Sequence, residues 1–414
     1  MRRSKLLLAS AFALALTLGS CADESSLPFV VTDGTGLVTE DGEPFEIRGT
    51  NLGCWLNPEG YMFQFPKSAS CARTINDALC EAVGPEYVAD FWRRFRESFI
   101  GEDDIRFIAS TGSTVIRLPF HYKFFTDETV LGSSDPELGF RMIDRVVDWS
   151  RKYGLRVILD MHDCPGGQTG DNIDDSYGYP WLFTDSAAQE KFLDIWGRIA
   201  RRYADEPVVL GYDLMNEPIA HYFPDKDSLN LALEPLMKRA VERVREYDSR
   251  HIVILGGAQW NGNFKVYNDF SFDSNLMYSC HIYKCPPVKG SLGGFIRFRE
   301  KSGKPMYMGE TGENTDEWVK SFREALDGSG IGWTFWTYKR LDTDRSFVSI
   351  PKPEGWDALV GFIASDRSSF ASLRENAPDR ELCRKALEDY LEGCRFSSCR
   401  VNSSYIEALG LSTR

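Results

Sequence analysis

Two glutamates stand directly behind apolar runs of this sequence. Glu217 and its neighbour Asn216 end the run "GYDLM", and Glu310 ends the run "MYMG". A carboxylate at the end of a buried strand must be hydrogen-bonded, paired or protonated, because an isolated buried charge is too costly. Each glutamate could therefore be a salt-bridge partner or a helix cap, or the two together could do acid and base chemistry at one site.

Other apolar runs end in side chains that could serve the same site. They end in an amide, an arginine, two of the five histidines, a tyrosine and a tryptophan: Asn51, Arg117, His162, His281, Tyr283 and Trp336. Each residue alone has an ordinary structural explanation, such as an internal ion pair, a hydrogen-bonded histidine or a core ring. Their shared position at the ends of separate runs is harder to attribute to chance, so the set predicts a functional site.

Eight short apolar runs must position these residues. The runs begin at Phe45, Ser113, Leu155, Val208, Ile252, Leu276, Pro305 and Gly332. Stretches with apolar residues three and four apart lie between several of them, at 87–108, 138–152, 187–203 and 229–247. Near-continuous apolar strands alternating with helices are typical of a parallel sheet buried on both faces. Eight of them predict a closed (β/α)₈ TIM barrel, in which the functional site lies at the carboxyl ends of the strands.

An open, doubly wound sheet is the alternative to the barrel, but no apolar run is followed by a GxGxxG phosphate loop. No break in composition marks a second domain. We predict a single catalytic domain over residues 28–392, with 381–391 as its last helix, and a C-terminal tail over residues 393–414. Two Asp-Gly steps, Asp33-Gly34 and Asp41-Gly42, predict a β-hairpin in front of the barrel.

The N-terminus has the layout of an export signal. Residues 1–20 contain three cations, no acid and an apolar stretch from Leu6 to Leu18 that is too short to span a bilayer. The following "LGSC" resembles a bacterial lipoprotein signal, which predicts lipidation of Cys21 and a polar tether over residues 21–27. We expect an exported outer-membrane or cell-surface lipoprotein, with a periplasmic or secreted protein as the alternative.

The charge balance restricts the partners. Without the signal, 45 basic residues stand against 61 acidic ones. Nucleic acids and anionic membranes call for basic surfaces, so we expect no nucleic-acid partner, membrane contact only through the lipid anchor, and a monomer.

Ten cysteines include Cys21, and the remaining nine cannot all pair within one chain. Cys394 and Cys399, in a serine-rich turn, are the best disulfide candidates, and the others are expected to be buried free thiols. Side chains alternate along a strand, so Cys280 should face the helices if His281 faces the barrel mouth. A metal site of Cys280, His281 and Cys285 would place its ligands on opposite faces, and we expect neither a metal nor another cofactor.

In combination, these residues resemble glycoside hydrolase family 5, the cellulase family. The likeness rests on an ordered set of motifs from residue 29 to 391: "IRLPF", "LDMHDCPGG", "DLMNEP", "CHIYK", "MYMGE" and "WTFWTYK". The segment "TNLGCWLNPEG" is also similar to the branch that includes β-1,3-glucanases. Where that branch usually has Gly-Gly-Trp, this chain has Gly53-Cys54-Trp55.

The resemblance implies a retaining glycosidase without a metal, in which two carboxyl groups lie about 5 Å apart. Glu217 would be the acid/base and Glu310 the nucleophile. Six further residues would bind substrate or hold the two glutamates in position: Arg117, His162, Asn216, His281, Tyr283 and Trp336.

The substrate is expected to be a β-linked glucan-type oligo- or polysaccharide. Glycolipid head groups, mannan or xylan are alternatives, and a non-catalytic surface glycan-binding lipoprotein is an alternative of another class. Long segments at 57–85, 165–183 and 339–356 should line the cleft with aromatic rings: Tyr61, Phe63, Phe65, Tyr177, Tyr179, Trp181 and Trp356. Such bulky loops favour a pocket for chain ends or short oligosaccharides at least as much as an open groove.

Overall fold

A closed barrel of eight parallel strands forms the centre of the molecule, as the sequence predicts. The computed structural model describes residues 27–413. The strands follow one another around the barrel in chain order, and the last pairs with the first. They are β3 (Arg48–Asn51), β4 (Val115–His121), β5 (Arg156–Asp163), β6 (Val209–Asp213), β7 (Ile252–Gly256), β8 (Leu276–His281), β9 (Met306–Glu310) and β10 (Gly332–Phe335).

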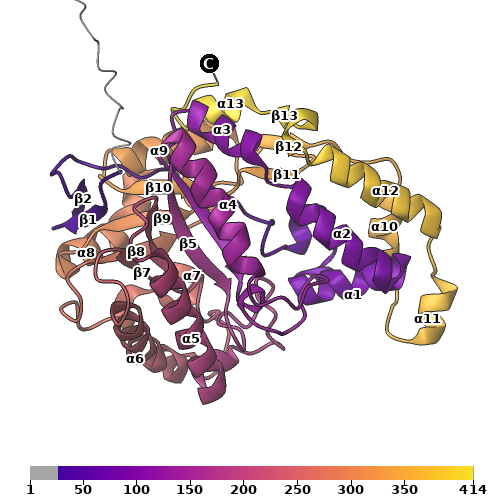
Figure 1. Cartoon of the computed structure of the whole chain (residues 1–414), viewed down its shortest axis with the longest axis horizontal. Helices are drawn as coiled ribbons and strands as arrows, with labels where there is room; N and C mark the ends of the chain where they lie inside the picture. Colours follow the sequence, from indigo (N-terminus) through magenta and orange to yellow (C-terminus); the bar gives the residue numbers. More distant parts are fainter. Residues whose placement is uncertain (1–26, 414) are drawn as a thin grey trace, which may run out of the picture.

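Helices surround the barrel (Figure 1). They are α1 (Ala72–Val83), α2 (Pro85–Ser98), α3 (Glu102–Ser110), α4 (Leu138–Tyr153), α5 (Ser186–Tyr203), α6 (Lys226–Arg245), α7 (Ala258–Asn261), α8 (Gly293–Ser302), α9 (Asp316–Asp327), α10 (Trp356–Ala364), α11 (Phe370–Glu375), α12 (Arg380–Gly393) and α13 (Ser403–Ala408). The stretch 87–108, whose spacing predicts helix, forms two helices, α2 and α3. The backbone of Gly101 is extended at this break, and its N–H donates to the Asp104 carboxylate, which starts α3.

Side chains alternate between two cores. Residues of one parity, such as Ile158, Ile254 and Met277, fill the barrel interior, whereas their neighbours pack against the helices. Cys280 belongs to the outer core, and the next residue, His281, lies among the mouth residues, as the period of two requires. The same alternation turns the last inward residue of each strand toward the mouth.

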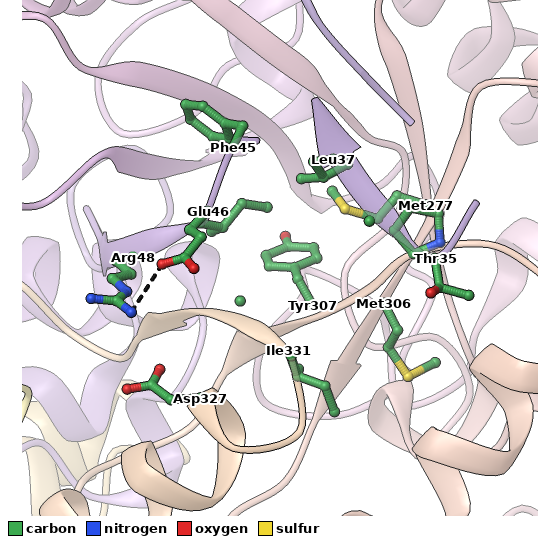
Figure 2. A pocket seen from close by; sticks show the side chains of 15 residues that line it. Thr35, Leu37, Phe45, Glu46, Arg48, Met277, Met306, Tyr307, Asp327 and Ile331 are labelled. Carbon is green, nitrogen blue, oxygen red and sulfur yellow. Dashed lines mark ion pairs between the residues drawn. The ribbon is translucent and has the colours of Figure 1, made fainter. Parts of the chain in front are cut away.

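A β-hairpin lies in front of the barrel, as predicted. It consists of β1 (Val30–Asp33) and β2 (Gly36–Thr39), joined at Gly34, whose φ of +55° suits glycine. Figure 2 shows a cavity of about 240 Å³ at this amino-terminal end of the strands, between Leu37 of the hairpin and Met277, Met306 and Tyr307 of the barrel. The hairpin therefore helps to cover the end of the barrel that faces away from the catalytic residues.

The C-terminal segment belongs to the folded domain, whereas the sequence suggested a tail. In it, β13 (Arg400–Val401) pairs with β12 (Val348–Ile350), which pairs in turn with β11 (Lys339–Leu341). The buried Lys339 ammonium donates to the carbonyls of Phe99 and Cys394 and pairs with Asp104 at 2.6 Å. This buried cation ties the end of α12 to the start of α3.

The expected disulfide between Cys394 and Cys399 is wrong. All nine cysteines of the described chain are free thiols, most of them buried. The short helix 396–398 separates the two residues, and the thiols instead contact main-chain carbonyls, Cys394 that of Leu391 at 3.2 Å and Cys399 that of Gly393 at 3.5 Å. Burial raises the pKa of Cys394 to about 12 and that of Cys399 to about 11, so both stay protonated at neutral pH.

Candidate active site

Arg117 is the centre of the candidate site. It lies within β4, is fully buried, and reaches toward four neighbouring strands. Its guanidinium donates to Glu310 Oε1 at 2.6 Å and to Asp213 Oδ2 at 3.0 Å, and it pairs with Asp160 Oδ1 at 3.0 Å. It also donates to the Asn216 side-chain oxygen at 2.9 Å. Five donors in a fixed planar fork suit this convergence of acceptors from several strands.

Glu310, the last residue of β9, is held by two donors. Arg117 binds one of its carboxylate oxygens, and the Tyr283 hydroxyl donates to the other at 3.0 Å. The side chain is only 6% exposed. A charge and a hydrogen bond thus fix the carboxylate plane at the mouth of the barrel.

Glu217 lies on a turn directly after β6, with a left-handed φ of +44°. Its carboxyl oxygen Oε1 is 2.8 Å from Nδ1 of His281. One carboxyl oxygen of Glu217, one of Glu310 and a ring nitrogen of His281 all lie within 4.8 Å of one another. Two residues that are far apart in the sequence therefore bring their carboxyl groups to one point.

The remaining predicted residues, among them His162, Asn216 and Trp336, are oriented by contacts with one another and with Asp160. His162 Nδ1 lies 2.7 Å from Asp160 Oδ2, so the aspartate accepts from this nitrogen. The His162 ring stacks on the Trp336 indole at a centroid distance of 5.4 Å. The Asn216 amide nitrogen lies 3.3 Å from His162 Nε2. All eight residues predicted for the catalytic site thus lie in one connected cluster.

The cluster contains more acidic than basic side chains. Burial and these neighbouring charges together set the protonation states of Glu217, His162 and His281. Burial raises the pKa of Glu217 to about 7, against the opposing charges of His162 and Arg117. Burial disfavours a charge on His162, but Asp160, Glu59 and Glu310 outweigh it and raise the pKa of His162 to about 10. Burial lowers the pKa of His281 to about 3, so this imidazole is neutral beside Glu217. A neutral neighbour leaves Glu217 free to keep its proton near neutrality.

Glu59 is a site residue that the sequence analysis missed. It is 4% exposed, lines the same cavity as the two other glutamates, and approaches His162 Nε2 at 3.7 Å. Burial, together with the charges of Glu310 and Glu217, raises its pKa above the usual value. The signal was present in "CWLNPEG", where an acid stands among turn residues just beyond the first strand.

The cavity around these residues has a volume of about 850 Å³. Its floor contains Glu217, Glu310 and Trp336, and its rim adds Trp260 and Lys284. Trp260 also escaped prediction, since it lies in the short element α7 after β7, with a left-handed φ of +56°, rather than at a strand end. This volume is in the range of pockets that bind small organic ligands.

The expected ring of aromatic loop residues is only partly correct. Tyr61 lines the cavity, and its hydroxyl accepts from the Trp336 indole N–H at 2.7 Å. Phe63, Phe65 and Trp356 instead stack in the core, where none is more than 7% exposed. Tyr179 and Trp181 pack against each other and do not line this cavity, and Tyr177 is 78% exposed. Apolar rings on these loops lie inside because burying them removes large areas from water.

Two groups of side chains in the described part of the chain have the spacing of metal ligands. One is Glu217, His281 and Glu310, whose oxygens and nitrogen are already engaged by one another, by Arg117 and by Tyr283. The other is His121, Asp163 and Asp175. There, His121 Nδ1 accepts from the Lys123 backbone N–H at 3.1 Å, so Nε2 carries the proton that a metal would have to displace. Neither donor set is arranged for a cation.

A sequence model of the cellulase family, glycosyl hydrolase family 5, matches residues 38–342. The chain belongs to glycosyl hydrolase family 5. It is therefore a glycoside hydrolase, as the resemblance of its motifs predicted. The match ends just after β11, and the parts of the barrel that carry all the predicted catalytic residues lie within it.

Relatives of this family 5 hydrolase include several glycosidases. A β-xylosidase of Phanerodontia chrysosporium is 31% identical over 259 residues, 62% of this chain and 52% of that protein. Endoglucanase C of Acetivibrio thermocellus is 27% identical over 314 residues, 61% of this chain and 88% of the enzyme. A sporulation-specific glucan 1,3-β-glucosidase of Saccharomyces cerevisiae is 29% identical over 259 residues, 58% of this chain and 56% of that protein. The chain thus spans about half the length of the first and third proteins. The third supports the predicted similarity to the β-1,3-glucanase branch.

Solved structures share the fold of this hydrolase. A rutinosidase from Aspergillus niger superposes with a TM-score of 0.57 at 20% identity and covers 72% of this chain and 90% of its own. A β-glucanase from Saccharophagus degradans gives a TM-score of 0.53 at 16% identity, over 90% of this chain and 96% of its own. The catalytic barrel is therefore common to these proteins.

Proposed function

We propose that this family 5 hydrolase cleaves β-glycosidic bonds of glucan-type oligosaccharides with retention of configuration. Glu217 is the acid/base, and Glu310 is the nucleophile. The observation that carries the proposal is the pair of carboxyl oxygens within 4.8 Å of each other. Retention needs carboxyl groups about 5 Å apart, whereas inversion needs roughly 6.5–9.5 Å to admit a water between carboxylate and sugar.

In the first step, Glu310 attacks the anomeric carbon while Glu217 gives its proton to the leaving oxygen. The two roles fit the two environments, because Arg117 and Tyr283 donate to the two oxygens of Glu310, whereas burial keeps the proton on Glu217 at mildly acidic pH. The bond from the sugar to the leaving oxygen breaks as the bond to Glu310 forms.

In the second step, Glu217 has lost its proton and accepts one from a water molecule, which attacks the glycosyl-enzyme and releases Glu310. Asn216 can hydrogen-bond the sugar 2-hydroxyl as positive charge develops on the ring. The orientation of its amide is fixed, since Arg117 binds its oxygen and its nitrogen lies 3.3 Å from Nε2 of His162, which lines the cavity. Trp336 presents a flat apolar face to the same sugar.

The substrate proposal rests on the walls of the cavity. Glu59 lies on the Trp336 side, where a buried carboxylate can accept hydrogen bonds from hydroxyls of the sugar that Glu310 attacks. Trp260 and Lys284 line the same cavity and are less buried than the two catalytic glutamates' neighbours Asn216 and Gly309. The relatives named after glucans support a β-glucan substrate.

We also propose that the enzyme is an exported lipoprotein anchored through Cys21. The support is the sequence alone, because residues 1–26 lie outside the described residues. Within residues 27–413, no helix has the length and apolar character needed to cross a membrane.

Two substitutions test the catalytic roles. Glu310→Gln should abolish hydrolysis of every substrate. Glu217→Ala should spare aryl glycosides with good leaving groups, because these need little protonation, while cleavage of oligosaccharides is lost. Azide should partly restore the second variant by attacking the glycosyl-enzyme. If both variants lost nitrophenyl glycoside cleavage equally and azide had no effect, the assignment of roles would be wrong.

A further inference from the structure

A second cavity adjoins the catalytic one. Its volume is about 500 Å³, and it lies between the loop after β3 and the loop after β5. Tyr61 and Asn172 line both cavities. Because the Tyr61 hydroxyl is bonded to Trp336, the second cavity opens from the side of the site where the sugar attacked by Glu310 would lie.

The walls of this second cavity are held in place by the two loops themselves. The backbone N–H of Arg73 donates to Asp175 Oδ1 at 2.8 Å, and the Asn57 amide donates to the carbonyl of Ile173 at 3.1 Å. The buried Asp174 carboxylate accepts from the backbone N–H groups of Thr169, Gly170 and Ser176. These contacts join the loops across the barrel mouth and give the cavity a defined shape.

Two cations and two acids line this cavity: Lys67, Arg73, Asp171 and Asp174. Within residues 27–413, neither Lys67 nor Arg73 has a carboxylate within 4.0 Å, and the buried Nε of Arg73 has no hydrogen-bond partner. Asp174 accepts from backbone N–H groups of its own loop, and Asp171 accepts from the backbone N–H of Asn172. The two cations therefore have no carboxylate partner and remain available to an anionic ligand.

The rest of the lining suits a sugar. The Arg73 guanidinium lies 4.5 Å from the centre of the Tyr177 ring, which holds the cation flat and leaves its edge for hydrogen bonds. Ser70 adds a hydroxyl group, and Tyr61 adds an aromatic face. Paired donors of this kind bind carboxylates with both geometry and charge.

We propose that the second cavity binds a hexuronate residue of the glycan, attached on the glycone side of the sugar in the catalytic cavity, with Arg73 and Lys67 binding its carboxylate. This inference rests on the proposed function and extends it to acidic glucan-type substrates. A neutral sugar would leave the two cations without a carboxylate partner. A free anion without a sugar would occupy the second cavity but would not extend into the catalytic cavity that adjoins it.

The test compares pairs of tetrasaccharides that differ only in charge. Cellotetraose and laminaritetraose are each used neutral and with glucose units oxidised at C6 to glucuronate. For the substrate whose linkage is cleaved, kcat/KM of the oxidised form should exceed that of the neutral form by about five- to tenfold at low salt, the value of one partly exposed charged contact. The preference should fall as ionic strength rises.

Substitution should remove this preference. In the double variant Lys67→Gln with Arg73→Gln, the ratio of the two kcat/KM values should fall to about one. The control is the double variant Lys320→Gln with Arg374→Gln, which changes one exposed lysine and one exposed arginine. Neither residue lines the catalytic cavity or the second cavity, so this variant should keep the wild-type ratio. A wild-type ratio of one, or a preference that persists in the Lys67 and Arg73 variant, would overturn the proposal.

Binding measurements separate this proposal from the catalytic one. Calorimetric titration of the Glu310→Gln variant with the same four tetrasaccharides requires no turnover. Tighter binding of an oxidised form, lost on substitution of Lys67 and Arg73, supports the second cavity even if the assigned catalytic roles fail. Equal binding of oxidised and neutral forms refutes the second cavity and leaves the catalytic proposal untouched.

Discussion

At the scale of residues, the site is two carboxyl groups with different surroundings. Glu310 faces a guanidinium and a phenol, and Glu217 faces a neutral imidazole. Burial raises the pKa of Asp213 to about 7, although the positive charge of Arg117 opposes this rise. Asp213 shares the guanidinium with Glu310 and accepts from the Tyr307 hydroxyl. Tyr307 also lines the cavity at the opposite end of the barrel, so one side chain contacts both ends of the interior.

The pH dependence of activity follows from Glu217. Its pKa is raised to about 7, so the proton needed for leaving-group departure is present below that pH and is lost as pH rises through it. Activity should trace a bell with an optimum at about pH 5 to 7, and its basic limb should fall near pH 7. Measurement of kcat/KM for an oligosaccharide from pH 4 to 10 tests this pH profile.

Two outcomes bear on that pH prediction. For aryl glycosides with good leaving groups, the basic limb should be weaker, because less protonation is needed. A plateau of full oligosaccharide activity up to pH 9 would show that Glu217 is not the proton donor.

At the scale of elements, the loop after β5 holds the turn that carries the acid/base. Gln168 donates to the carbonyls of His162 and Asn216 at 2.8 Å each, and the Thr169 hydroxyl donates to the carbonyl of Glu217 at 2.7 Å. The backbone N–H of Ile219 donates to the carbonyl of Gln168 at 2.8 Å. Because Glu217 has a left-handed backbone, these contacts hold a conformation that a glutamate rarely adopts.

Thr169→Val should therefore impair the acid step more than binding. Valine keeps the shape of threonine and removes the hydroxyl donor, so the loss of about 1 kcal/mol corresponds to a fall of roughly fivefold to tenfold in kcat for oligosaccharides. Nitrophenyl glycosides should lose less, because they depend less on the position of Glu217. Steady-state kinetics on both substrate types measure the difference.

Thr169→Ser is the matched control, since it retains the hydroxyl and should recover most of the activity. An equal loss on both substrate types would point to a general defect in the fold, and no loss would mean that the turn is held without this hydrogen bond.

At the scale of the whole molecule, the N-terminal hairpin and the catalytic cavity lie at opposite ends of the barrel. The first described residue, Leu27, leads into the hairpin at the amino-terminal end of the strands, whereas the catalytic cavity opens at the carboxyl ends. Figure 1 shows α1, α2, α10 and α12 packed together on one side of the barrel, with α11 projecting beyond them. The catalytic cavity therefore opens at the end of the barrel opposite to the hairpin that follows Leu27.

Lipidation at Cys21 predicts that the expressed protein is recovered with the membrane fraction. Two or more acyl chains give stable anchoring, and a lipoprotein cysteine supplies them. Cys21→Ser should release an active enzyme into the soluble fraction with unchanged kcat/KM, because the tether precedes the fold. Fractionation followed by an activity assay measures this, and a wild-type protein found only in the culture supernatant would contradict it.

The sequence by itself determined the barrel and the predicted catalytic set. Strand period, helix period and the residues at strand ends are local properties, and parallel strands in one closed sheet must bring their carboxyl ends together. Hence Arg117, Glu217 and Glu310 could be placed at one mouth without knowledge of any distance.

Only the tertiary structure decided what the loops do. Glu59 reaches the cavity from a loop and Trp260 from the short element α7. Phe63 and Trp356 are buried instead of facing a sugar, and Cys394 remains a thiol. No local period encodes these outcomes, because a loop's path is set by long-range contacts such as those of Asp175 with the backbone of Arg73. The same contacts create the second cavity, whose lining comes from segments about a hundred residues apart.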